Sequence, residues 1–203
     1  MGEVYERLLR AIARNDDEIR FAVRCGSRVY GTATPASDED FFVVLRDREA
    51  KRDLVWVDHM NVVIHGTGAF EAALAEQSVF ALECLCTPAE HRLKEATPRF
   101  PLEVRRARLF DSVKDRSDSD FKKALKRYDE DPAAARKRVF HALRVLSFAR
   151  QLLEAGRITD FSAANGWWEE LADATELTPQ DIERRFGSIR EELITQLGAL
   201  TRR

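Results

Sequence analysis

The sequence has no long apolar run, since no stretch of its 203 residues approaches the roughly 20 consecutive apolar residues that cross a bilayer. Cysteine is scarce as well: Cys25, Cys84 and Cys86 cannot form a disulfide framework, and an odd number suits a reducing compartment. Cys84 and Cys86 form a C-x-C pair with no second ligand pair nearby, which favours buried thiols over a zinc site. We therefore expect neither a membrane protein nor a disulfide-stabilised secreted one.

The composition also excludes several fibrous and unfolded classes. Apolar residues make up 44% of the chain and charged residues 33%, as in ordinary globular proteins, and no internal repeat or low-complexity segment occurs. The first ten residues, MGEVYERLLR, form an acidic-basic helical pattern that is unlike a secretory signal peptide. These features predict a cytoplasmic protein that has no membrane partner.

Charge is unevenly distributed along the chain. The net charge of −2 is the sum of −5 over residues 1–98, +7 over 99–150 and −4 over 151–203. A basic middle segment favours a phosphate-bearing ligand, although a solvated helix face explains the same pattern. At this net charge the sequence shows no strongly basic face of the kind that duplex-binding proteins carry.

The order of apolar patterns predicts an α+β fold. Alternating or continuous short apolar runs predict strands at 19–23, 40–45, 54–57 and 61–65, with helices at 4–13, 68–76 and 79–84. Beyond Pro88 the strand signals stop, and spacings of three and four predict helices at 133–154, 164–174 and 179–200. Gly156 is the expected C-cap of the first of these, and Thr175 or Thr178 the N-cap of the last. We expect a small mixed sheet with flanking helices at 1–95 and a helical domain at 96–203.

The segment that most clearly indicates a catalytic or ligand-binding site runs from Gly26 to Leu45. A strand ends at Gly26-Ser27, where a residue without Cβ lets a phosphate approach the backbone and a hydroxyl can donate to it. Asp38 and Asp40 follow at the mouth of the next strand, and the two-residue period places both carboxylates on one face. Two such charges favour a divalent cation, and hard oxygen ligands suit Mg²⁺. A solvated turn explains the acidic residues alone, but not their combination with Gly-Ser.

This combination resembles the DNA polymerase β-type nucleotidyltransferase superfamily. GSRVYGTATPASDEDFFVV is similar to the signature of the bacterial and phage branch whose members accompany RNA-repair ligases. VVIHGTGAFEAALAEQSVFALECLCTP and KRVFHALRVLSFARQLLEAGRI are similar to that branch's later strand-plus-helix and basic-helix segments. The resemblance covers roughly residues 20–160 and implies a nucleotidyltransferase sheet followed by a helical domain that closes the nucleotide cleft.

The resemblance also implies roles for individual residues. Asp38 and Asp40 would be catalytic and would ligate Mg²⁺ or Mn²⁺. The nucleotide-binding residues would be Gly26 and Ser27 at the phosphates, Arg28 and Tyr30 along the pocket, and Lys137, His141 and Arg144 on one helix face. Four of these residues also have a structural alternative. Tyr30 would be a packing aromatic, His141 a core histidine, and Lys137 and Arg144 part of a solvated helix face. Glu39, between the aspartates, points to the opposite face and is expected to be an exposed bystander.

One position departs from the superfamily pattern. A third carboxylate usually helps to deprotonate the acceptor hydroxyl, and the corresponding residue here is Asn61, an amide that takes no proton at neutral pH. Asp58 would replace it if the alignment is shifted by three residues. Otherwise transfer is slow, or the protein binds nucleotides without turning them over.

The sequence therefore predicts a magnesium-dependent enzyme that moves a nucleoside monophosphate from an NTP to a hydroxyl, with an RNA end favoured as acceptor and pyrophosphate released. The alternatives are a catalytically impaired nucleotide sensor and a toxin-type enzyme that modifies tRNA or a protein. Apolar helix faces near the C-terminus would either pair two protomers in a homo-oligomer or complete an internal core.

Overall fold

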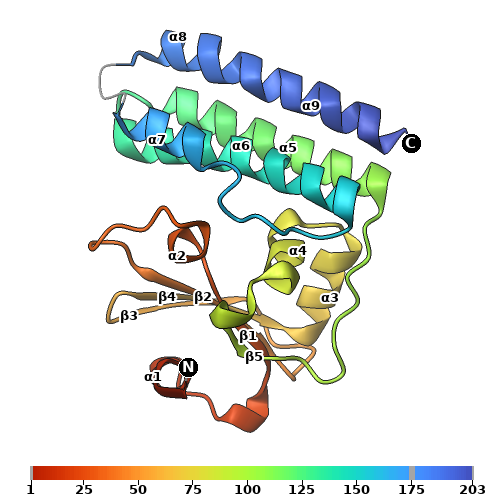
Figure 1. The fold of residues 1–203 in the computed structure, drawn as a ribbon. Coiled ribbons are helices and arrows are strands. Elements are labelled where there is room, and N and C mark those ends of the chain that lie inside the picture. Colours follow the sequence, from red (N-terminus) through yellow and green to blue (C-terminus); the bar gives the residue numbers. More distant parts are fainter. Residues whose placement is uncertain (1, 174–176, 203) are drawn as a thin grey trace. The chain divides into compact units, whose positions relative to one another are not determined.

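The computed structural model describes residues 2–173 and 177–202 (Figure 1). The chain forms two compact units, which are considered one at a time. The first comprises Met1–Glu76 and Phe80–Leu102, and the second comprises Gln77–Val79 and the chain from Glu103 onward. The fold is α+β, as the sequence predicts: strands lie in the first unit, and the described part of the second is helical.

A mixed five-stranded sheet with the order β3-β4-β2-β1-β5 organises the first unit. The central strands β2 and β4 are parallel, and the other neighbours are antiparallel. The bounds of the strands are β1 Ile19–Cys25, β2 Glu39–Leu45, β3 Asp53–Val57, β4 Met60–Gly66 and β5 Arg92–Lys94. The helical elements of this unit are α1 Gly2–Ala11, a 3₁₀ turn at Asp16–Glu18, α2 Ser27–Tyr30, α3 Thr67–Ala75, α4 Val79–Cys86 and a 3₁₀ turn at Ala89–His91.

Each face of the sheet has its own apolar core, because alternate residues of a strand point to opposite faces. Leu8 and Ile12, from α1 and the turn after it, pack with Phe41 and Val43 of β2 on one face. On the other face Phe42 meets Phe70 of α3 and Phe80 of α4, with ring centroids 5.3 and 5.2 Å apart. Figure 1 shows α1 on one side of the sheet and α3 and α4 on the other. Burial of these aromatic and branched side chains from both faces fixes the sheet.

The predicted strands are present. To the predicted elements the structure adds the strand β5, the short helix α2 and two 3₁₀ turns in this unit, and a helix at Arg106–Lys126 in the second unit. β5 was not predicted, because three residues of sequence Arg-Leu-Lys show no alternation; it is held by pairing with Ala22 and Val23 of β1. The glycine- and serine-rich segment after β1 contains the short helix α2 between Gly26 and Gly31. Asp58 and His59, both with positive φ, form the predicted tight turn between β3 and β4.

The second unit is built on long helices: α5 Arg106–Lys126, α6 Pro132–Ala155, α7 Asn165–Asp173, α8 Pro179–Ile182, a π-helical turn at Glu183–Gly187, and α9 Ser188–Thr201. Asp131 caps α6 by accepting a hydrogen bond from the Ala134 amide, and Gly156, with φ 71°, ends it in the left-handed conformation. Thr178 caps α8 with a capping box, whereas Thr175 lies outside the described residues. The predicted helix over 179–200 is therefore present, with a π-helical turn inside it.

One apolar core joins these helices. Buried side chains from α5, α6, α7 and the π-helical turn form it, and Trp167, Trp168, Ile189 and Leu193 pack against it. The apolar face of α9 therefore contributes to an internal core. Within residues 2–173 and 177–202, no helix combines the length and apolar composition needed to span a membrane.

Candidate active site

In the first unit, the backbone and a carboxylate lie close together where β1 ends beside β2. Cys25 is the register partner of Asp40, and Gly26 follows with φ 75° and ψ −158°, a conformation that is essentially restricted to glycine. A Cβ at Gly26 would lie 2.2 Å from Asp40 Oδ2, so no other residue fits there without displacing the carboxylate. Gly26 and Asp40 thus form one packed unit at the mouth of the sheet.

Asn61 lies next to Asp40 on the same face. β2 and β4 are parallel, Asn61 is the register partner of Asp40, and its Nδ2 donates a hydrogen bond of 2.9 Å to Asp40 Oδ1. The register therefore brings Asn61, and not Asp58, beside Asp40. Asn61 Oδ1 is buried and has no hydrogen-bond partner among the described residues. An unsatisfied buried oxygen is costly without a ligand, so this atom is available to a cation.

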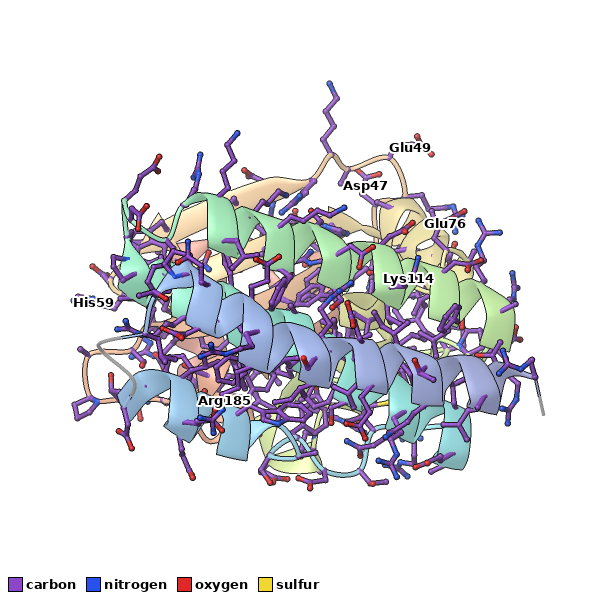
Figure 2. All side chains as sticks on the ribbon, turned by 90° about the horizontal axis from the view of Figure 1, so that it is seen from above. Asp47, Glu49, His59, Glu76, Lys114 and Arg185 are labelled. Carbon is purple, nitrogen blue, oxygen red and sulfur yellow. The ribbon has the colours of Figure 1, made fainter. Side chains whose placement is uncertain are left out.

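Asp38 stands just before β2, two residues from Asp40 and nearer the β3–β4 turn. Its Oδ1 lies 3.8 Å from His59 Nδ1. The His59 side chain is 91% exposed and projects outward from that turn (Figure 2). Asp58, the other candidate for a third carboxylate, is exposed in the same turn. The described chain thus presents two carboxylates and one amide, Asp38, Asp40 and Asn61, at this edge.

Glu39 points to the opposite face, as the alternation predicts, but it is not an exposed bystander. Its carboxylate forms ion pairs with Arg7 of α1 and, at 2.9 Å, with Arg24 of β1, and its side chain is only 20% exposed. Arg24 also lies over the Phe41 ring. Glu39 therefore ties α1 to the sheet, a role that depends on a helix distant in the sequence.

The three predicted pocket residues after Gly26 lie in different environments. Ser27 begins α2, and its hydroxyl makes no hydrogen bond to any described residue. Arg28 is exposed and donates a hydrogen bond of 2.9 Å to the Ser37 carbonyl, which fixes the loop before Asp38. Tyr30 is buried, 4% exposed, and its hydroxyl donates to Glu83 of α4. Tyr30 thus occupies the packing position that was its structural alternative.

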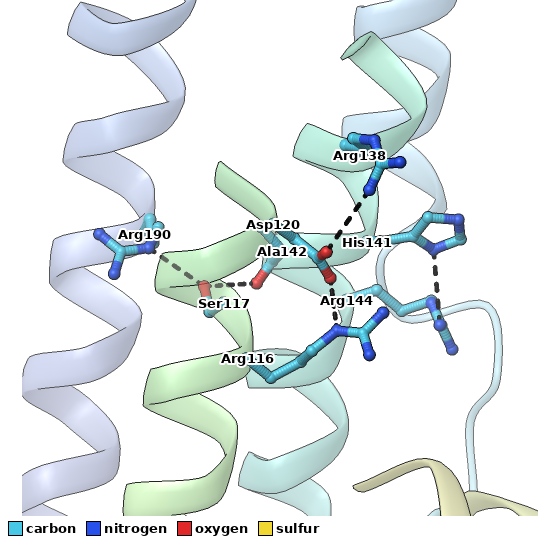
Figure 3. Close-up of polar contacts among 8 residues, drawn as sticks. All are labelled: Arg116, Ser117, Asp120, Arg138, His141, Ala142, Arg144 and Arg190. Atoms are coloured by element: carbon cyan, nitrogen blue, oxygen red, sulfur yellow. Dashed lines mark hydrogen bonds and ion pairs between the residues drawn. The ribbon is translucent and has the colours of Figure 1, made fainter. Parts of the chain in front are cut away.

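In the second unit, Lys137, His141 and Arg144 follow one another along α6. Lys137 is exposed and Arg144 is buried, with its guanidinium 5.0 Å from the Phe148 ring. His141 Nδ1 lies 3.5 Å from Arg144 Nη2 (Figure 3). Because guanidinium only donates, Nδ1 accepts and the ring proton belongs on Nε2.

The His141 imidazole is neutral at physiological pH. Burial, followed by the positive charges of Arg144, Lys137, Arg116 and Arg138, lowers its pKa to about 3. Close by, the Asp120 carboxylate is buried between Arg116, at 2.6 Å, and Arg138, at 3.9 Å (Figure 3). Asp120 carries only one signal in the sequence, its spacing of four from Arg116.

Sequence reasoning also missed Trp56, the register partner of Asn61 in β3. A two-residue turn at Asp58-His59 places positions 56 and 61 opposite each other, so the signal was present in the sequence. Trp56 is 62% exposed, which sequence reasoning could not supply.

A comparison with protein families identifies the chain. The model of RlaP, described as the RNA repair pathway DNA polymerase beta family, matches residues 1–180. The chain belongs to this RNA repair pathway DNA polymerase beta family. Membership implies a nucleotidyltransferase, and it confirms the resemblance drawn from the Gly26–Leu45 segment.

Among solved structures, a nucleotidyltransferase-like protein from Exiguobacterium sibiricum 255-15 is 14% identical, with all of this chain and 75% of that chain covered and a TM-score of 0.33. No curated protein matches the chain.

The donor set at this site fits a hard divalent cation. Carboxylate oxygens of Asp38 and Asp40 and the unpartnered Asn61 Oδ1 lie at one edge of the sheet, and oxygen donors of this kind are those that Mg²⁺ takes in proteins. Within the described ranges no three or more His, Cys, Asp or Glu side chains gather into a metal-binding group.

Proposed function

We propose that the protein is a Mg²⁺-dependent nucleotidyltransferase that moves a nucleoside monophosphate from an NTP to a hydroxyl, with the end of an RNA strand as acceptor. The observation that carries this proposal is the contact between Gly26 and Asp40 beside Asn61. Family membership supports the reaction class, and the words RNA repair pathway in the family description favour RNA.

In this proposal the residues at the ends of β1, β2 and β4 have different roles. Asp38, Asp40 and Asn61 Oδ1 would hold the cation, which neutralises phosphate charge and acidifies the acceptor hydroxyl when bound. Gly26 leaves the space that a phosphate needs at the backbone, and the Ser27 hydroxyl is available to donate to it. Arg28 fixes the loop through Ser37 and so positions Asp38 rather than the nucleotide.

Nucleotidyl transfer needs no reactant other than the NTP and the acceptor hydroxyl. The acceptor oxygen bonds to the α-phosphorus, the bond from that phosphorus to the bridging oxygen breaks, and pyrophosphate leaves with the electron pair. Asn61 cannot accept the hydroxyl proton, and Asp40 Oδ1 already accepts the Asn61 amide. The proton therefore passes to water, which predicts that the rate rises with pH until the acceptor is ionised.

The direct test incubates the protein with each α-labelled NTP, Mg²⁺ or Mn²⁺, and an RNA with a free 3′-hydroxyl. Label on the RNA together with stoichiometric pyrophosphate is the expected result. Asp38→Ala and Asp40→Ala should both abolish it. Label on protein or on tRNA alone would transfer the proposal to a toxin-type acceptor, and absence of label with every acceptor would refute transfer.

Asn61 specifically favours a second candidate, a nucleotide sensor that does not turn over. In that case the protein binds one NTP tightly with Mg²⁺, releases no pyrophosphate, and loses binding in Asp40→Ala. Calorimetric titration with each NTP separates this candidate from the enzyme.

A further inference from the structure

Exposed side chains lie along one face of the edge strand β3. We call Arg52, Leu54 and Trp56 the row. Leu54 and Trp56 are 59% and 62% exposed, and among the described residues only Leu102, at 37%, is another exposed large apolar side chain. β3 ends the strand order, so one side of its backbone has no neighbouring strand. Large apolar side chains on an unpaired edge are a liability, and soluble proteins retain them chiefly where a ligand or partner covers them.

The row lies on the same face of the sheet as the candidate active site. Trp56 is directly opposite Asn61, and Leu54 is opposite Val63, in the antiparallel pair of β3 and β4. Asn61 in turn donates to Asp40. Side chains of register partners share a face, so Trp56, Asn61 and Asp40 occupy three successive strands of one surface. The row is therefore continuous with the site that the proposed function uses.

A positive charge extends the row at its other end. Arg52 precedes β3 at the position that alternation places on the face of Leu54 and Trp56, and it is exposed. Its charge acts on His65, which lies on this face of β4 and whose pKa is lowered by burial and by Arg52. Lys51 adds a second exposed cation. Asp53, between Arg52 and Leu54 in the chain, accepts a hydrogen bond from the Leu54 amide with its carboxylate.

We propose that Arg52, Leu54 and Trp56 bind the unpaired nucleotides at the end of the RNA acceptor strand, with a base stacked on Trp56 and a backbone phosphate at Arg52. This inference rests on the proposed function for its acceptor. An aromatic face suits any base, and a cation beside it suits the phosphate, which is the pattern of single-strand binding surfaces. Base-paired RNA hides the faces of its bases, so the row selects unpaired ends.

An apolar peptide fits the row less well, because it would leave the Arg52 and Lys51 cations without partners. A second copy paired antiparallel along β3 is the other occupant, and the sedimentation measurement below tests it. A polyanion with flat apolar groups satisfies both halves of the row.

The experiment measures binding without NTP, so that it does not depend on catalysis. A fluorescein-labelled single-stranded RNA is titrated with wild type, Trp56→Ala, Trp56→Phe and the exposed control Leu102→Ala, and anisotropy gives each Kd. We expect Trp56→Ala to weaken binding about tenfold or more, and Trp56→Phe to stay within about threefold, because stacking on an aromatic ring is retained. Leu102→Ala should bind as wild type does.

Tryptophan fluorescence gives a second readout. Unlabelled RNA should quench the wild type, and the Trp56-dependent part of this quenching should vanish in Trp56→Phe although that variant still binds. Circular dichroism and sedimentation of each variant establish its fold and mass. The proposal is overturned if Trp56→Ala binds RNA as tightly as wild type, if Trp56→Phe is quenched as much as wild type, or if duplex RNA competes equally.

Failure of this inference and failure of the proposed function give different results. Loss of RNA binding in Trp56→Ala, without transfer by any variant, supports the row and refutes the enzyme. Transfer with an unchanged KM for RNA in Trp56→Ala does the reverse. A change from dimer to monomer in Trp56→Ala, with RNA affinity unchanged, would assign the row to an interface between copies.

Discussion

Like charges gather in both units of the molecule, and the two units accommodate them differently. On α6 and its neighbour α5, the positive charges of Arg116 and Arg138 meet the buried Asp120 carboxylate, and His141 stays neutral. At the mouth of β2, Asp40 lies beside an amide and a glycine, and Asp38 lies 3.8 Å from His59. The first arrangement is complete within the chain, whereas the second suits an added cation.

The comparison separates structural charge from charge available to a ligand. Glu39 demonstrates this within three residues, because it is the acid of the Asp38–Asp40 segment that two arginines neutralise. Asp40, the next residue, faces the surface that carries Asn61 and Trp56. A run of three acids thus contributes one structural anchor and two candidate ligands.

The largest expected effect comes from removing a charge on the ligand face. Asp40→Asn keeps the shape and the neighbours but removes the carboxylate, so nucleotidyl transfer should fall about a thousandfold or more. Transfer rates under saturating NTP and Mg²⁺ measure this. A variant that retains activity within a few fold would show that Asp40 is not a ligand.

A somewhat smaller loss should follow from Gly26→Ala. Its Cβ would lie 2.2 Å from Asp40 Oδ2, so the carboxylate must move, and a displacement of about 1 Å costs about a hundredfold in rate. The backbone conformation adds about 1–3 kcal/mol of instability. Gly166→Ala, where a Cβ meets no atom within 4 Å, is the matched control and should preserve both activity and thermal stability.

Asn61→Asp would add a third acid beside Asp40, on the face of the sheet that carries the candidate active site. In Mg²⁺ the new carboxylate can take the acceptor proton, and transfer should rise about tenfold. In EDTA the three like charges repel one another, so the melting temperature should drop below that of wild type. An unchanged rate together with an unchanged metal dependence of stability would contradict the assignment.

The pH dependence of stability tests the cluster of charged groups around His141 in the second unit. The pKa of His141 is about 3 in the folded chain and about 6.5 when unfolded, so only the unfolded state gains a proton between these values. The resulting stability is complete above pH 6.5 and is lost as the pH falls toward 3. From pH 7 to pH 5, wild type should lose about 2 kcal/mol more than His141→Gln in urea unfolding. His59→Gln, which changes an exposed histidine, should follow wild type.

The smallest expected effect comes from Glu39, whose carboxylate is paired with two arginines on the opposite face of β2. Glu39→Gln leaves the Arg7 and Arg24 guanidinium groups without their carboxylate, which should cost about 1 kcal/mol because the side chains are partly exposed. Nucleotidyl transfer should be unchanged. Chemical denaturation measures the first effect, and loss of activity in a folded Glu39→Gln protein would place Glu39 in the site.

Local patterns were enough for most of the fold. Alternation predicted β2 and the β3–β4 hairpin, because each strand is half or fully buried over several residues. The three-residue strand β5 escaped, since Arg92–Lys94 forms only by pairing with β1. Tyr30 and Arg28 were expected to line a pocket, yet one is buried against Glu83 and the other is fixed on Ser37, contacts between residues that no local pattern links.

By itself, the sequence determined the family and the α+β class, because these depend on residue order and short-range geometry. Its alternation predicts that Asp38 and Asp40 share a face. The tertiary structure decided which atoms meet: Asn61 rather than Asp58 beside Asp40, Glu39 between two arginines, and Trp56 exposed opposite Asn61. The physical reason is that strand register and burial are set by the cores on the two faces of the sheet, which combine residues from distant parts of the chain.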